Sequence, residues 1–84
     1  MDFDRLMSIL GGPTATARLL GIRDASVHGW RVNGIPDYRL EQLAPEIERA
    51  SGGRYMRWDI CPAVWRRRWP ELRSHPDAPK EVSA

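Results

Sequence analysis

The stretch Pro13–Asn33, which reads PTATARLLGIRDASVHGWRVN, decides the fold. Its pattern predicts two short helices joined by a tight turn, because Gly21 tolerates the positive φ that such a turn demands. Ala17 falls where the two helices cross, and its small side chain lets them approach closely. Val27 and Trp30 share one face of the second helix and are expected to point inward. A buried inner face and a presented outer face indicate a helix-turn-helix.

The remaining residues of this motif divide between the two faces. Three further apolar side chains are expected to complete the inner face, namely Leu19, Leu20 and Ile22. The residues left on the outer face, where a ligand would meet them, are Arg23, Asp24, Ala25, His28 and Gly29. The second helix is predicted to begin with Arg23 or Asp24 as its cap and to end by Val32 or Asn33.

Helices are also predicted on both sides of the motif. Asp2 or Asp4 can cap a first helix that ends at Gly11-Gly12, and Pro13 opens the next helix, which continues through Leu20. Asp37 can cap a fourth helix, in which Pro45 should cause a break or a kink. The segment after it, EIERASGG, is then a short separate helix or a bent continuation with Ile47 and Ala50 inward.

The C-terminal third is expected to be less regular. Residues 54–60 alternate polar and apolar side chains imperfectly, which predicts an extended segment or a short exposed strand. Pro62 is expected to open another short helix, PAVWRRRW. From Ser74 onward the chain has no helical or strand periodicity, so we expect a disordered tail over 74–84 after a domain over 1–73.

Charge is unevenly distributed along the 84 residues, although the formal net charge is only +2. Residues 54–73 hold six Arg against two acidic residues, a net charge of +4. Residues 1–53 and 74–84 each carry a net charge of −1. Arg suits phosphates and guanine edges, but a balance of this modest size is as typical of an ordinary solvated surface.

The cysteine content and the hydropathy favour a cytoplasmic protein without an enzyme site. Cys61 is the one cysteine, and no second Cys or His lies at metal-ligand spacing around it. No run approaches the ~20 apolar residues of a membrane span. The sequence also lacks the nucleophile and base arrangement of a hydrolase and a phosphate-binding glycine loop, so we expect no catalysis, no cofactor and no metal.

Three runs carry a resemblance to a known family: LGGPTATARLLGIRDASVHGWRVNGIP, then IERASGGRYMRWDICPAVW, then RRRWPEL. Together they resemble the Cro-type helix-turn-helix regulators of bacteria and prophages, most closely the YdaS-like group, which is described as antitoxin or phage Cro repressor. The resemblance implies an all-α, lambda-repressor-like bundle of about five short helices. It also implies a nucleoid-associated, sequence-specific repressor that binds duplex DNA as a homodimer at a palindromic operator.

We expect the helix from about Asp24 to Val32 to enter the major groove. Base edges would be met by Arg23 and His28, with Ala25 and Gly29 as further contacts. The DNA backbone would be held by Thr14, Thr16, Arg18, Arg31, Asn33 and Arg39. The two Thr could equally serve as caps in solvent, and His28 could simply be solvated. Asp24 is favoured as a helix cap over a cytosine contact, and Gly29 either lets the backbone approach the groove or is a tolerated weak position.

The aromatic residues near the C-terminus have two interpretations. Trp58, Trp65 and Trp69 are favoured as core residues, because large aromatic side chains dominate small cores. Alternatively, they anchor a dimer or a protein partner such as a toxin, together with Tyr55 and Ile60. A chain of this length buries only roughly 60% of its unfolded surface, which favours pairing with a second copy.

Overall fold

The helix-turn-helix forms at the predicted residues. The computed structural model describes residues 2–80, and in them α2 spans Pro13–Leu20 and α3 spans Asp24–Asn33. Gly21 ends α2 with a φ of 68°, and its N–H donates to the carbonyl oxygens of Ala17 and Arg18. The αL conformation is accessible to glycine without a steric penalty, so the turn depends on this residue.

The core between α2 and α3 is mostly the predicted one. Ala17, Val27 and Trp30 are buried, as expected from their spacing. Leu19 was predicted to face inward, and this was wrong, because 48% of its surface is exposed. The inward place on α2 belongs instead to Thr16, whose hydroxyl donates to the carbonyl oxygen of Gly12 at 2.9 Å and is thereby satisfied.

The helix that precedes the motif completes this part of the fold. Helix α1 spans Phe3–Leu10, and the side chain of Asp2 caps it by accepting from the N–H of Arg5 at 2.8 Å. Its buried residues, Leu6 and Met7, lie on the face that packs against α2 and α4. The first helix therefore begins and ends as its sequence predicts.

Helix α4 corrects three predictions. It runs without interruption over Asp37–Ala50, so Pro45 does not break it and no separate helix follows, whereas the alternative of a kink with a bent continuation stays a prediction. Its N-cap is Pro36 instead of Asp37. Pro45 removes one backbone donor, but three fully buried side chains around it, Leu43, Ala44 and Ile47, pack against α1 and α5 and stabilise the continuous helix. Ile47 is inward as predicted, whereas Ala50 is exposed.

The predicted extended segment is also wrong. Residues 57–60 form the short helix α5, Arg57–Ile60, and no strand occurs in residues 2–80. The Asp59 carboxylate accepts from the N–H of Met56 at 3.0 Å, which caps the first turn. Glu48 on α4 accepts from the N–H of Arg57 at 3.0 Å. These two carboxylates satisfy backbone donors that a strand would have left to solvent.

The rest of the chain packs around tryptophan. Helix α6 spans Trp65–Arg68, three residues later than Pro62 suggested, and the 3₁₀ helix η1 spans Pro70–Ser74. Trp58 and Trp65 meet edge to face, with ring centroids 5.7 Å apart. Trp69 is buried with them, so the interpretation of the three Trp as core residues is confirmed.

Part of the expected tail makes defined contacts. The ring of His75 lies against that of Trp58, with centroids 5.2 Å apart, and Ala78 packs on the core. The remainder of that expectation, residues 81–84, lies outside the described residues. The boundary of the domain at residue 73 stays a prediction.

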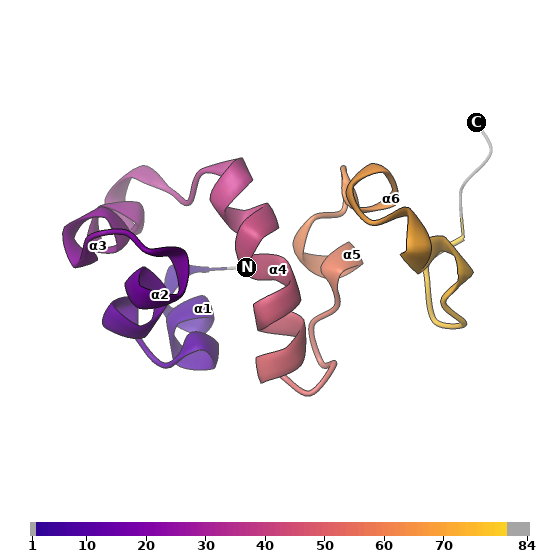
Figure 1. Ribbon diagram of the computed structural model, residues 1–84, viewed down its shortest axis with the longest axis horizontal. Helices are drawn as coiled ribbons and strands as arrows, with labels where there is room; N and C mark the ends of the chain where they lie inside the picture. The colour runs from indigo at the N-terminus through magenta and orange to yellow at the C-terminus, as the bar shows by residue number, and fades with distance from the viewer. Residues whose placement is uncertain (1, 81–84) are drawn as a thin grey trace.

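The predicted all-α fold is confirmed, and Figure 1 shows how its elements are arranged. Helix α4 lies in the middle, with α1–α3 on one side and α5, α6 and η1 on the other. We call α1–α4 the N-terminal lobe and residues 54–80 the C-terminal lobe. The molecule measures 42 × 26 × 20 Å, so the two lobes form the ends of its long axis. Within residues 2–80, no helix is both long and apolar enough for a membrane crossing.

Candidate nucleic-acid interface

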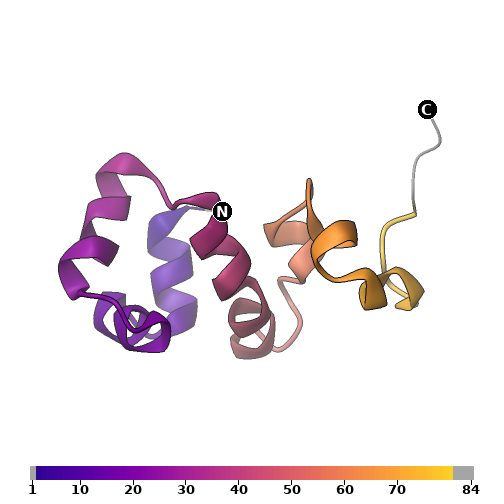
Figure 2. The ribbon, with the colours of Figure 1, turned by 45° about the horizontal axis from the view of Figure 1, so that its top comes forward.

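Helix α3 forms one end of the molecule and turns one face away from the core (Figure 2). Val27 and Trp30 point inward. The opposite face, at helical spacing, consists of four residues: Ala25, His28, Gly29 and Val32. Ala25 and His28 are exposed, and 86% of the surface of Val32 is exposed. We call this set the outer stripe of α3.

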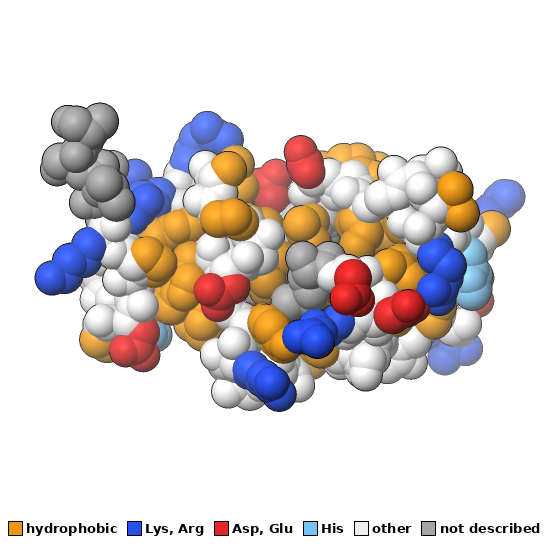
Figure 3. Space-filling model, turned by 180° about the vertical axis from the view of Figure 1, so that it is seen from behind, with side chains coloured by type: hydrophobic (Ala, Val, Ile, Leu, Met, Phe, Trp, Pro, Cys, Tyr) orange, Lys and Arg blue, Asp and Glu red, His pale blue; other side chains and the backbone are white. Residues whose placement is uncertain are grey.

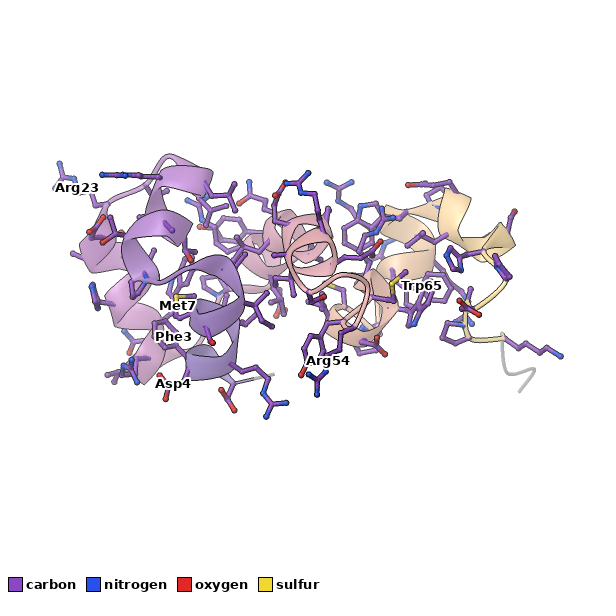
Figure 4. All side chains as sticks on the ribbon, turned by 90° about the horizontal axis from the view of Figure 1, so that it is seen from below. Phe3, Asp4, Met7, Arg23, Arg54 and Trp65 are labelled. Atoms are coloured by element: carbon purple, nitrogen blue, oxygen red, sulfur yellow. The ribbon has the colours of Figure 1, made fainter. Side chains whose placement is uncertain are left out.

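Arg23 stands at the N-terminal end of the outer stripe. It is the N-cap residue of α3, with an extended backbone, and Figure 4 shows its side chain projecting outward at this end of the molecule. Within residues 2–80, no carboxylate lies within 4.0 Å of its guanidinium. Its planar fork of donors is therefore available to an external acceptor.

Asp24 does not cap α3, which corrects the favoured interpretation of this residue. It is the first helical residue, and its carboxylate accepts from the Thr14 hydroxyl at 2.8 Å. The bond joins the N-terminal ends of α2 and α3. The Thr14 hydroxyl donates its proton in this bond, so its oxygen can only accept a further hydrogen bond.

Thr16 is not part of the surface, so the prediction that it contacts DNA is corrected. Its side chain is fully buried, and its hydroxyl is engaged by Gly12 and lies 3.6 Å from the sulfur of Met7. The hydroxyl can be buried because the backbone of its own helix accepts from it. Sequence periodicity alone gives no sign of this, since Thr at the second turn of a helix is normally exposed.

Two arginines of the predicted phosphate set are held by neighbours. Arg31 pairs with Asp4 of α1 at 2.7 Å and lies over the ring of Phe3, which Figure 4 labels beside Asp4. Arg39 donates to Gln42 at 3.0 Å and lies over the ring of Tyr38. Exposed pairs of this kind contribute at most about 1 kcal/mol, so both side chains can still reorient toward a phosphate.

Arg18 and Asn33 are exposed at the flanks, and two surface residues extend the predicted set. Ser26 lies in the first turn of α3 and is exposed, and Val32 is the most exposed large apolar residue of the chain that is described. Counting the helical period outward from Val27 and Trp30 finds both positions, but their residue types give no functional signal.

Gly29 has no structural need to be glycine. It is helical, its φ is not positive, and a Cβ built on it would meet only the side-chain nitrogen of Asn33, at 4.0 Å. Glycine inside a helix costs about 1 kcal/mol relative to alanine. The fold therefore gives no reason for this residue, and both interpretations of Gly29, a close approach to DNA and a tolerated weak position, stay predictions.

The residues predicted for a dimer or partner contact lie mostly inside the C-terminal lobe. Trp58, Ile60, Trp65 and Trp69 are buried within the single chain. Tyr55 is half-buried, and its hydroxyl accepts from Arg5 at 2.9 Å. Little of these side chains is left for a second molecule to cover.

Cys61 is an inert thiol in this environment. It is buried and unpaired, and burial, reinforced by the negative charges of Glu41 and Asp37, raises the pKa of the thiol from 9.0 to about 11. The neutral thiol is neither a good nucleophile nor a metal ligand. In the described part of the chain, no group of three or more His, Cys, Asp or Glu side chains could hold a metal ion.

Two comparisons with known proteins match most of the sequence of this chain. A family model described as bacterial toxin YdaS matches residues 3–68, which run from the start of α1 to the end of α6. A protein of Escherichia coli (strain K12) named "Putative transcriptional regulator YdaS" is 34% identical over 72 residues, which cover 86% of this chain and 68% of that protein. No solved structure matches the chain. The chain belongs to the YdaS family.

Proposed function

We propose that this protein is a transcriptional regulator that binds duplex DNA sequence-specifically through α3. The observation that carries the proposal is the outer stripe of α3, presented at one end of the molecule beside Arg23, which pairs with no carboxylate of residues 2–80. The name of the relative in Escherichia coli, a transcriptional regulator, supports the same class of function. The protein acts by binding alone, in the cytoplasm, without a cofactor.

In this mechanism α3 lies in the major groove with its outer stripe toward the base edges. Arg23 and His28 donate to acceptors on the bases, and the methyl groups of Ala25 and Val32 contact thymine methyls. Gly29 lets the helix backbone approach the base pairs, because no side chain stands between them. The free N–H groups at the start of α2 favour a backbone phosphate, and Arg18, Arg31, Asn33 and Arg39 flank the groove.

The regulator acts as a homodimer at a palindromic operator. Two α3 helices related by a two-fold axis would be spaced by roughly 34 Å, one turn of DNA. Occupancy of a promoter would then repress transcription. The small size of the core supports pairing, since a chain of this length gains stability from a partner.

Protein binding through the C-terminal segment is the alternative function. The description of the family as a toxin fits an antitoxin or another partner-binding module as well as a regulator. The buried Trp side chains disfavour them as the contact, so such a partner would use the charged surface of the C-terminal lobe.

The double variant Arg23→Ala, His28→Ala tests the proposal. Both side chains are exposed, so the fold should be retained while affinity for a selected duplex falls by roughly tenfold or more. The matched control is Arg49→Ala, which removes an exposed arginine of α4 that pairs with Glu46. Equal affinities for the double variant and the control would refute binding through α3.

A further inference from the structure

A basic hollow opens on the C-terminal lobe, at the opposite end of the molecule from α3. It has a volume of about 350 Å³ and lies between α6, η1 and residues 75–80. Four basic or imidazole side chains line it, Arg66, Arg73, His75 and Lys80, and its apolar wall includes Trp65 and Pro79. Among the residues that the structure describes, no carboxylate lines it. Figure 3 shows basic side chains at this end of the molecule.

Two of these side chains are held in place by the chain itself. Arg66 donates to the carbonyl oxygen of Pro79 at 2.9 Å and lies over the ring of Trp65, 4.7 Å from its centroid. Figure 4 shows Trp65 directed into the lobe. His75 accepts from the N–H of Asp77 at 3.0 Å through Nδ1. These contacts fix part of the wall of the hollow, which lowers the entropy cost of binding a ligand there.

Within the described residues, ion pairs engage other arginines of the C-terminal lobe and not the basic side chains that line the hollow. Arg57 pairs with Glu48 and Glu71, and Arg68 pairs with Glu41. By contrast, in the stretch from residue 2 to residue 80, no carboxylate lies within 4.0 Å of Arg66, Arg73 or Lys80. Among residues 54–80, three of the five arginine and lysine side chains without such a pair therefore line this hollow, and their charge favours an anionic ligand.

The position of the hollow disfavours the duplex bound by α3 as that ligand. Helix α3 lies at one end of a molecule that is 42 Å long, and α6, which helps to form the hollow, lies toward the other end (Figure 1). DNA lying against α3 would run across that end and leave the C-terminal lobe out of reach. This step rests on the proposed function of α3.

We propose that the hollow binds an acidic, partly apolar segment of a protein partner. Carboxylates of the segment pair with Arg73 and Lys80, whose exposed side chains rim the hollow. Apolar side chains of the segment pack on the wall that includes Pro79. This wall favours a peptide over a bare phosphate, which gains nothing from apolar contact.

Titration of the full chain with a short labelled peptide tests this site. The peptide alternates Glu with Leu and Ala, and its matched control carries Gln in place of each Glu. We expect the acidic peptide to bind and to shift the backbone NMR signals of residues 73–80 while leaving those of α3 unchanged. The double variant Arg73→Gln, Lys80→Gln should weaken binding roughly tenfold and leave duplex affinity unaltered. Its matched control is Arg67→Gln, an exposed arginine of α6 that does not line the hollow.

Several results would overturn the proposal. One is the absence of binding by the acidic peptide, and another is equal binding by the Gln peptide. Equal weakening by Arg67→Gln would show a general charge effect. Inorganic phosphate or a non-operator duplex that shifts residues 73–80, when the peptide does not, would assign the hollow to a small anion or to nucleic acid. Because the readout needs no operator, it remains decisive even if α3 binds no DNA.

Discussion

The two lobes of this molecule reach stability by different means. In the N-terminal lobe, helices of 8 to 14 residues bury apolar faces at helical spacing, and capping residues and glycines end α1 and α2. In the C-terminal lobe, α5 and α6 have four residues each, and tryptophan burial takes the place of long helices, together with backbone hydrogen bonds that the carboxylates of Asp59 and Glu48 accept. The first kind of structure follows local rules, whereas the second depends on tertiary contacts.

The largest expected effect comes from removing the central aromatic side chain of the C-terminal lobe. Trp65 is only 3% exposed, so Trp65→Ala should lower the free energy of unfolding by about 3–5 kcal/mol. Urea denaturation measures the loss, and hydrogen exchange locates it. Protection should fall in residues 54–80 and persist in α1–α3. An equal fall in both lobes would mean that they unfold as one unit.

The second prediction concerns Cys61, which lies where α4 meets the C-terminal lobe. Its pKa in the folded protein is about 11 against 9.0, so above pH 9 the unfolded chain loses a proton that the folded chain keeps. Stability should therefore decline as the pH rises from 9 toward 11, by up to about 1.4 kcal/mol per pH unit. Denaturation across this range measures the slope. In the Cys61→Ala variant, the free energy of unfolding should decline less steeply between pH 9 and pH 11. An equally steep decline in the variant would contradict the burial of the thiol.

Two glycine variants test how the backbone conformation of glycine affects the stability of the N-terminal lobe. Gly29→Ala should raise the free energy of unfolding by about 0.5–1 kcal/mol, because the position is helical and has room for a Cβ. Gly21→Ala should lower it by about 1 kcal/mol or more, because φ is 68° there. Thermal denaturation measures the expected rise in stability of the first variant and the expected fall in stability of the second. The more stable Gly29→Ala variant should also bind its duplex less tightly, and unimpaired binding would remove the proposed role of Gly29.

The smallest effect is expected at the Arg31–Asp4 pair. Both side chains are more than half exposed, so Asp4→Asn should change the free energy of unfolding by less than about 0.5 kcal/mol. Duplex affinity should rise slightly, because the variant removes a negative charge beside Arg31. Thermal denaturation and fluorescence anisotropy measure the two quantities. A larger loss of stability would mean that the pair fixes α1 against α3.

The same contrast explains what could be predicted from sequence. Caps and glycine positions gave the bounds of α1, α2 and α3 because such signals act locally. The continuity of α4 through Pro45 and the helical form of Arg57–Ile60 could not be predicted, since both depend on burial against other elements. In the site, the outer face of α3 followed from periodicity.

Three features could not be predicted from caps, glycine positions or helical periodicity. The hydrogen bond from Thr14 to Asp24 needs the packing of α2 on α3, and the burial of Thr16 needs an acceptor one turn earlier. The hollow of the C-terminal lobe joins residues of α6 and η1 to residues 75–80, which carry no periodic pattern. Such features come from the three-dimensional arrangement alone.

Selection of bound duplexes from a random-sequence pool at near-physiological salt tests the central claim, that α3 reads DNA. We predict enrichment of a palindrome whose half-sites lie about one helical turn apart, with thymines among the preferred bases. The Arg23→Ala, His28→Ala variant should lose this enrichment. A pool that shows only salt-sensitive background, with no enriched sequence, would contradict sequence-specific binding by α3.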